Sequence, residues 1–284
     1  MSIFTSYVYE AMIQSLKTHY SFLEIDVIGN SRMGKPIYAL TLGYGPVSLL
    51  VNAAHHANEW ITALLLTKFA KDCAKEIKPA WDSWTNNKEP GGTNAWYEQV
   101  TLHMVPLVNP DGVDLVTTTS SHNNWKANAV GVDLNSNYPA SWEQAKAHKF
   151  ARGYTAPGPR DYVGPNALSE PESMAMTAFT KYVDPAFTIS LHTQGEEIYW
   201  RYKDFNPPGA LELALGFFRA SGYHLEDVPA ESSHAGYRDW FISHYNRPGF
   251  TIECGLGTSP LPLSDFDEIY KKLHPLLYFA IQNS

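Results

Sequence analysis

The sequence is poor in cysteine, with only Cys73 and Cys254, and these two do not form a spacing typical of a metal ribbon. We therefore expect two buried thiols rather than a disulfide framework. Basic residues are also scarce: 21 Lys and Arg stand against 29 Asp and Glu, which gives a net charge of −8. No block of Lys or Arg occurs, so neither nucleic acid nor an anionic membrane is an expected partner.

Long apolar runs are missing as well, and no stretch approaches the roughly 18 apolar residues of a membrane-spanning helix. The segment Met1 to Glu10 has no basic start, no apolar core and no small-residue cleavage site, so it does not predict a signal peptide. The sequence as given therefore predicts a cytoplasmic protein without a membrane span. Its 284 residues, 44% of them apolar, suffice for one large α/β domain over residues 1–284.

Apolar periodicity predicts alternating strands and helices. Strands are expected at Leu23–Ile28, Ile37–Leu42, Val47–Ala54, Val100–Val108, Phe187–His192 and Gly249–Cys254. Helices are expected at Tyr7–Tyr20, Glu59–Glu76, Glu170–Val183, Leu211–Ser221, Tyr237–Tyr245 and Ser264–Ile281. The strands Val47–Ala54 and Val100–Val108 are apolar enough to be central in a sheet covered on both faces. Two stretches rich in Gly, Pro, Asn and Trp, Lys78–Trp96 and Gly153–Ala167, are expected to be long loops that rim a cleft.

Polar side chains interrupt this pattern where apolar strands end. His56 and Glu59 follow the strand Val47–Ala54, and His192 closes the run Phe187–His192. Two imidazoles and a carboxylate suit Zn²⁺, and three protein ligands leave a position open for water, as in catalytic zinc sites. Because open α/β sheets build their sites at the carboxyl ends of strands, the sequence predicts one zinc ion there.

Glu253 ends another apolar strand, where a carboxylate has no packing reason to be, and we interpret it as the catalytic base. Each signal alone is weak, since an isolated His-x-x-Glu match is more often a helix-start ion pair and a strand-end His is more often a packed one. His55 could also pair with Glu59 at the i, i+4 spacing. Strand alternation sends His55 and His56 to opposite faces, and we prefer His56 as the ligand.

Five motifs occur in order along the chain: Ala54–Trp60, Asn109–Gly112, Gly131–Asn135, Leu191–His192 and Thr251–Glu253. The series resembles the zinc carboxypeptidases of the pancreatic carboxypeptidase superfamily, from about Gly29 to the C-terminal helix. The resemblance implies a single α/β domain whose central sheet is mixed, largely parallel and twisted, with about eight strands flanked by helices. It also implies that His56, Glu59 and His192 bind zinc and that Glu253 activates the water.

The resemblance implies roles for three neighbouring residues. Asp133 matches the carboxylate that orients a ligating imidazole, and the alternative is a turn residue before Leu134. Asn135 matches a substrate-binding Asn. Lys126 stands where the family has an Arg that stabilises the oxyanion, and a Lys there keeps the charge but loses the planar fork.

Other positions depart from the family pattern. Ser136 occupies the place of the Arg that binds a peptide's terminal carboxylate, and Asn58 replaces a further Arg. The Tyr that overhangs the pocket has no counterpart in Glu231–His234. Arg238 matches a position at the base of the side-chain pocket, where it should select a carboxylate-bearing group. The alternative for Arg238 is a surface residue paired with Asp239 or another acid.

Ser136, Arg238 and the segments Trp125–Asn128, Gly131–Pro139 and Leu168–Glu172 most resemble the bacterial γ-D-glutamyl-L-diamino acid endopeptidases. This resemblance implies cleavage of peptidoglycan stem peptides between γ-D-glutamate and meso-diaminopimelate or lysine. The alternatives are a carboxypeptidase or amidase acting on acidic C-terminal residues, and a non-catalytic peptide binder. An upstream targeting or wall-binding module would place the protein at the cell wall instead of in the cytoplasm. The sequence makes no prediction of the oligomeric state.

Overall fold

A mixed sheet forms the centre of the computed structural model, which describes residues 4–85, 95–229 and 233–284. Its eight strands in these ranges are β1 (Glu24–Asn30), β2 (Pro36–Leu42), β3 (Val47–Ala53), β4 (Val100–Val105), β5 (Phe187–His192), β6 (Glu197–Tyr199), β7 (His224–Glu226) and β8 (Gly249–Glu253). Their order across the sheet is β1-β2-β4-β3-β5-β8-β6-β7. The pairs from β4 to β8 are parallel, the pairs β1-β2, β2-β4 and β8-β6 are antiparallel, and the pair β6-β7 at one edge is parallel again. The predicted fold class is confirmed.

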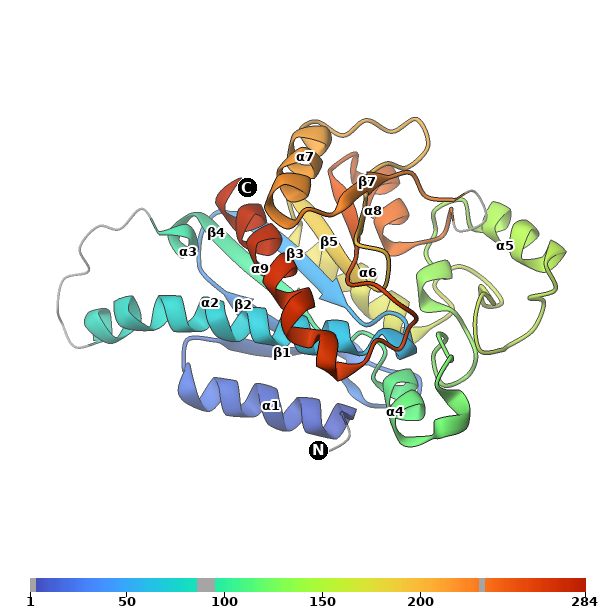
Figure 1. Cartoon of the computed structure of the whole chain (residues 1–284), viewed down its shortest axis with the longest axis horizontal. Helices are drawn as coiled ribbons and strands as arrows, with labels where there is room; N and C mark the ends of the chain where they lie inside the picture. The colour runs from blue at the N-terminus through green and yellow to red at the C-terminus, as the bar shows by residue number, and fades with distance from the viewer. Residues whose placement is uncertain (1–3, 86–94, 230–232) are drawn as a thin grey trace.

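Helices cover both faces of the sheet (Figure 1). The helices of the described residues are α1 (Ser6–His19), α2 (Ile61–Thr85), α3 (Trp96–Gln99), α4 (Pro110–Thr118), α5 (Trp142–Ala151), α6 (Pro171–Val183), α7 (Ala210–Ser221), α8 (Tyr237–Tyr245) and α9 (Phe266–Gln282). Short 3₁₀ turns include η1 (Ala57–Glu59) and η3 (Leu134–Ser136). Among the described residues, no helix combines the length and apolar composition that crossing a membrane requires.

Side-chain alternation along the strands divides the interior into two cores. On β3, Leu49 and Val51 point into the core shared with α1, α2, α7 and α9, which lie in front of the sheet in Figure 1. Leu50 points to the opposite face, into the core beneath α6 and α8. Because both faces are covered, the middle strands are apolar on both sides, as the sequence predicts for β3 and β4.

The carboxyl ends of β3, β5 and β8 meet at one edge, because these three strands are parallel neighbours. Ala53 lies opposite Leu191, and His192 lies opposite Glu253 on the next strand. After β3 the chain turns sharply at Ala54, which has a left-handed φ of 51°. This turn leads into η1, which therefore lies beside the ends of β5 and β8 although these strands are far away in the sequence.

The prediction of a cleft-rimming loop at Lys78–Trp96 is wrong for its described part, and residues 86–94 lie outside the described residues. α2 continues through Pro79 to Thr85. The ring of Trp81 packs 5.3 Å from that of Phe22, and these contacts favour the helix beyond the proline.

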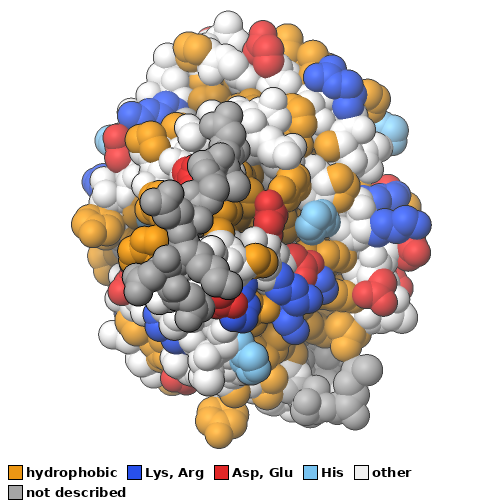
Figure 2. Space-filling model, turned by 90° about the vertical axis from the view of Figure 1, so that its left-hand side faces the viewer, with side chains coloured by type: hydrophobic (Ala, Val, Ile, Leu, Met, Phe, Trp, Pro, Cys, Tyr) orange, Lys and Arg blue, Asp and Glu red, His pale blue; other side chains and the backbone are white. Residues whose placement is uncertain are grey.

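α2 begins at the edge where β3 ends and runs away from it, so its last turn lies at the opposite end of the molecule (Figure 1). Figure 2 faces that end and shows apolar side chains among charged ones. Near the last turn of α2, Tyr44 and Trp84 are exposed and line a groove together with Tyr97. The second predicted loop, Gly153–Ala167, does lack helices and strands and reaches the edge where β3, β5 and β8 end.

Other predictions differ at element ends or miss short elements. β4 ends at Val105 rather than Val108, and the helix expected from Glu59 begins at Ile61 after the turn η1. The elements α3, α4, α5, β6 and β7 were not predicted. β6 and β7 are three residues long, too short for a periodic signal. For α4 a signal existed, because Asn109 followed by Pro110 is a typical helix start.

Asn109 connects the turn after β3 with two other segments. Its side-chain amide donates to the carbonyls of His55, at 3.0 Å, and Ala127, at 3.2 Å. Its side-chain oxygen accepts from the amide of Gly112 at 3.0 Å and so caps α4. All of these contacts are buried, which makes them costly to lose.

Replacing Asn109 with Ala should lower the free energy of unfolding by about 2–4 kcal/mol, because it leaves two buried carbonyls and one amide without partners. Asn109→Asp is the matched variant, since it keeps the cap but cannot donate to the carbonyls. Urea unfolding followed by circular dichroism measures both. Equal stability of all three proteins would contradict the role given to this side chain.

Candidate active site

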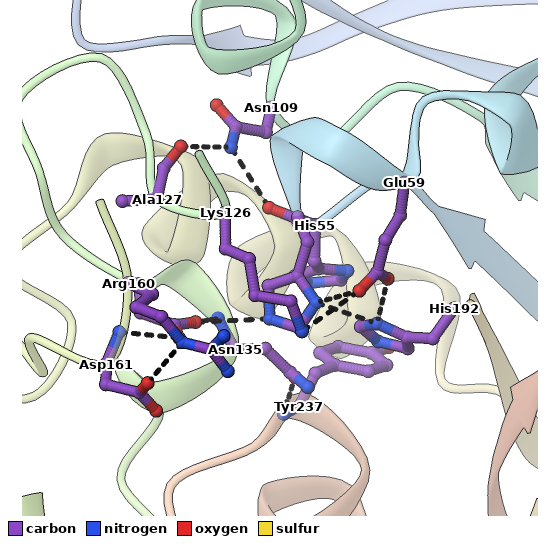
Figure 3. Close-up of polar contacts among 12 residues, drawn as sticks. His55, Glu59, Asn109, Lys126, Ala127, Asn135, Arg160, Asp161, His192 and Tyr237 are labelled. Atoms are coloured by element: carbon purple, nitrogen blue, oxygen red, sulfur yellow. Dashed lines mark hydrogen bonds and ion pairs between the residues drawn. The ribbon is translucent and has the colours of Figure 1, made fainter. Parts of the chain in front are cut away.

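Three buried side chains converge where β3 and β5 end (Figure 3). Nδ1 of His56 lies 2.9 Å from one carboxylate oxygen of Glu59, and Nδ1 of His192 lies 2.8 Å from the other. The two Nδ1 atoms are 3.2 Å apart, and one atom from each residue falls within 4.8 Å of the others. The structure thus brings together the three ligands predicted from the sequence.

The charges of this cluster fit a divalent cation. Glu59 is fully buried, and although burial raises the pKa of its carboxyl, His56, Lys126 and His192 hold it well below its usual range. Burial lowers the pKa of His56, but Glu59 and Asp133 raise it to about 9. A buried anion that attracts positive charge, flanked by two imidazole nitrogens, is a donor set that suits Zn²⁺.

Asp133 contacts the imidazole of His56 at the ring nitrogen that does not face Glu59. Its Oδ1 lies 3.2 Å from Nε2 of His56 and accepts from the amide of Asn135 at 3.1 Å, while its Oδ2 accepts from the amide of Asp161 at 3.2 Å. Burial raises the pKa of Asp133, yet the neighbouring His56 lowers it below its usual range. A carboxylate in this position fixes the orientation of a ligating imidazole and increases its basicity.

Three residues that were not predicted support Asp133: Asp161 contacts it directly, and Lys149 and Arg160 contact Asp161. Asp161 has a left-handed φ of 66°, and its amide donates to Asp133. Its own carboxylate forms a buried ion pair with Lys149 of α5 and accepts from Nε of Arg160 at 2.7 Å. No periodic pattern marks these residues, although Arg160 and Asp161 lie in the loop predicted to rim the cleft.

Glu253 lies beside the cluster, because β8 places it opposite His192 in the parallel register. The side chain lines the cleft and is partly exposed. Burial and the negative charge of Glu59 raise its pKa to about 8, with Lys126 and His56 acting in the opposite direction. A carboxyl group tuned toward neutral pH can accept and return a proton during catalysis.

Lys126 also lines the cleft, with its Nζ 3.2 Å from Glu59 Oε1. Burial lowers the pKa of this ammonium, but Glu59, Asp133 and Glu253 raise it, so the group stays charged. The backbone fixes the position, because the carbonyl of Lys126 accepts from the amide of Ala57 at 2.9 Å. The ammonium therefore lies next to the cluster, where negative charge would develop in acyl transfer.

His55 lies outside the cluster. Its Nε2 is 2.8 Å from the hydroxyl of Tyr138, and its ring stacks on that of His192 with centroids 6.0 Å apart. Burial holds the pKa of His55 well below its usual range, so its ring is neutral. The two histidines separate because of the turn at Ala54 rather than by strand alternation, since β3 has already ended there.

A cleft of about 200 Å³ opens in front of the cluster. Besides Glu253 and Lys126, its walls include Asn135, Ser136, Arg238, Asp239 and Tyr199. Asn135 is anchored, because its side-chain oxygen accepts from the amide of Tyr237 at 3.1 Å. Tyr199 was not predicted from the sequence, which contains no motif around the short strand β6.

Arg238 lies at the cleft, as one interpretation of the sequence expects, and forms the ion pair with Asp239 that the other expects, but it is not a surface residue, because its side chain is buried. Asn58 is buried as well, and Glu231 and Ser232 lie outside the described residues. Ser136 is buried at the cleft wall and brings no charge to it.

The sequence matches a known family over nearly its whole length. Residues 9–272 fit the family model of the zinc carboxypeptidases. The chain belongs to the zinc carboxypeptidase family. It is therefore a metallopeptidase, and zinc is the metal of its family. Its fold is also that of solved zinc carboxypeptidases, such as carboxypeptidase A from Helicoverpa armigera, with a TM-score of 0.75 at 18% identity. That match covers 100% of this chain and 75% of the other.

Within the zinc carboxypeptidase family, the chain is 40% identical to γ-D-glutamyl-L-diamino acid endopeptidase 1 from Lysinibacillus sphaericus. The match covers 92% of this chain and 67% of the relative. Murein peptide amidase A from Escherichia coli K12 is 37% identical over 94 residues, which cover 32% of this chain and 35% of the amidase. Bovine thrombin-activatable fibrinolysis inhibitor has a TM-score of 0.79 at 18% identity, over 99% of this chain and 97% of that chain.

Replacing His56 or His192 with Ala should weaken zinc binding by more than about 100-fold, since loss of a supporting carboxylate alone typically costs about 10- to 100-fold. His55→Gln is the matched control and should still bind zinc. Zinc content after dialysis and competition with a chelator measure the three variants. Zinc retained by His56→Ala and lost by His55→Gln would show that the wrong histidine has been assigned.

Proposed function

We propose that the protein is a zinc-dependent endopeptidase that hydrolyses peptidoglycan stem peptides between γ-D-glutamate and a diamino acid. The observation that carries the proposal is the His56-Glu59-His192 cluster with Glu253 beside it at the end of the neighbouring strand. One zinc ion per chain is part of the proposal, since the described residues contain one such group of potential ligands.

Zinc bound at this cluster supplies a Lewis acid that polarises the scissile carbonyl and lowers the pKa of water. Glu253 accepts the proton of the attacking water and then delivers it to the leaving amine. Lys126 supplies positive charge on the same side of the cleft and neutralises the charge that develops on the carbonyl oxygen. Asp133 keeps the ring of His56 in one orientation throughout.

The choice of substrate rests on the cleft wall. Ser136 provides no guanidinium for a terminal carboxylate, so binding does not require a free peptide end at that point. Arg238 lies within the cleft and can interact with a carboxylate of the substrate. The similarity to an endopeptidase named for γ-D-glutamyl-L-diamino acid bonds supports a stem peptide, which carries several carboxylates.

Arg238 also favours a second candidate, a carboxypeptidase or amidase that acts on peptides with acidic C-terminal residues. In that case Arg238 would bind an acidic side chain directly. The absence of charge at Ser136 makes this alternative weaker, because such an enzyme must still recognise a terminal carboxylate.

Glu253→Gln should keep zinc and lower kcat by about 100-fold or more, because the amide cannot accept the proton. Glu226→Gln, on the exposed strand β7, is the control and should leave kcat unchanged. Zinc content and kcat, measured on the same preparation of each variant, test this prediction. Normal turnover by the Glu253→Gln variant would refute the assignment of the base.

The wild-type enzyme should cleave L-Ala-γ-D-Glu-meso-diaminopimelate with a higher kcat/KM than a hippuryl-type carboxypeptidase substrate, because its cleft lacks the terminal-carboxylate guanidinium. Mass spectrometry of the products should show free diaminopimelate and the dipeptide L-Ala-D-Glu. A clear preference for the hippuryl substrate would end the stem-peptide proposal and favour the carboxypeptidase.

A further inference from the structure

We infer that the base of the substrate pocket binds a zwitterionic amino-acid group, with Arg238 holding its carboxylate and Asp239 its ammonium. The inference rests on the proposed function and makes it more specific. Of the two diamino acids, meso-diaminopimelate ends in such a group, whereas the lysine side chain ends in an ammonium alone. The enzyme should therefore discriminate between them.

The two residues form a buried pair at the start of α8. Arg238 is 6% exposed and Asp239 is 2% exposed, and both line the cleft. Nε of Arg238 donates to Oδ1 of Asp239 at 3.1 Å, and Nη2 donates to the same oxygen. Within the described part of the chain, Nη1 of Arg238 and Oδ2 of Asp239 have no hydrogen-bond partner, and neither is sealed from solvent. One donor group and one acceptor atom of this buried pair thus remain available to a ligand.

The charges of the pair favour a ligand with both signs. An isolated carboxylate would be attracted by Arg238 but repelled by Asp239. An isolated ammonium would be attracted by Asp239 but repelled by Arg238. A group with an adjacent carboxylate and ammonium satisfies both residues, and buried charges gain most when each is paired and hydrogen-bonded. The position of Asp239 therefore changes the earlier expectation for Arg238 from a carboxylate site to a zwitterion site.

The surroundings of the pair also suit this group. The ring of Tyr199 lies 6.0 Å from the guanidinium of Arg238 and forms a wall of the cleft. Asp239 Oδ2 lies near Gly236, where an added Cβ would come within 3.2 Å of that oxygen. A side chain at position 236 would crowd the acceptor, so glycine keeps this part of the cleft open.

Asp239 also lies in the first turn of α8, where an acidic residue stabilises the helix. A purely structural role for the pair is thus the competing explanation. Asp267 provides a matched control, because it lies in the first turn of α9, is exposed and does not line the cleft.

The test measures kcat/KM for three tripeptides that share L-Ala-γ-D-Glu and end in meso-diaminopimelate, L-lysine or L-2-aminopimelate. The last of these has the side-chain carboxylate without the ammonium. Wild type should prefer the diaminopimelate peptide by about tenfold or more over each of the others, since one charged hydrogen bond is worth roughly that much. The Asp239→Asn variant should no longer prefer the diaminopimelate peptide over the aminopimelate peptide. The Arg238→Gln variant should no longer prefer the diaminopimelate peptide over the lysine peptide. Asp267→Asn should change neither.

Two results would overturn the inference. One is equal kcat/KM for the lysine and diaminopimelate peptides in wild type. The other is an Asp239→Asn variant that loses the same factor on all three peptides together with a lower Tm, which is the signature of a structural role.

Calorimetric binding of free meso-diaminopimelate, L-lysine and L-2-aminopimelate separates this inference from the proposed function. If no γ-D-glutamyl peptide is cleaved but meso-diaminopimelate binds at least about tenfold more tightly than the other two, the proposed bond is wrong and the zwitterion site stands. If the peptides are cleaved and the three free compounds bind equally, the proposed function stands and the zwitterion site is wrong.

Discussion

A fully buried carboxylate, that of Glu59, is the constraint around which this molecule is organised. An unpaired charge in the interior is very costly, so the surrounding chain must supply positive charge and hydrogen bonds. It does so from three directions: His56 from the turn after β3, His192 and the amide of Thr193 from the end of β5, and Lys126 from a loop. The groups that stabilise this buried carboxylate also form the geometry of a metal site.

Support for this centre extends outward through the fold. The Lys149–Asp161 ion pair, the amide of Asp161 and the carboxylate of Asp133 form a continuous series of contacts that ends on His56. It links α5 and an irregular loop to the edge of the central sheet. Zinc enzymes use such contacts to hold a ligating ring in place, and their loss weakens metal binding even though the ligands themselves are intact.

The sequence predicted the parts of the site that interrupt a regular pattern. His192 and Glu253 were recognisable because a polar residue ends an apolar strand, and the sheet then brings the strand ends together. Lys149 and Asp161 could not be predicted in this way, because their partner is decided by the path of an irregular loop. The error at Lys78–Trp96 has a similar origin: turn-forming residues suggested a loop, whereas tertiary packing of Trp81 favours the helix. Local composition predicts less where contacts between distant segments decide the structure.

The pairing of His192 with Glu253 across β5 and β8 has a consequence for how this fold diversifies. Their separation is set by the ordinary spacing of about 4.8 Å between strands, which backbone hydrogen bonds hold constant. Insertions in the surrounding loops leave that distance untouched. Solved structures that share only 18% of their residues with this chain have the same fold. The loops that form the walls of the cleft can therefore change during evolution, while the distance between these two strand ends is kept.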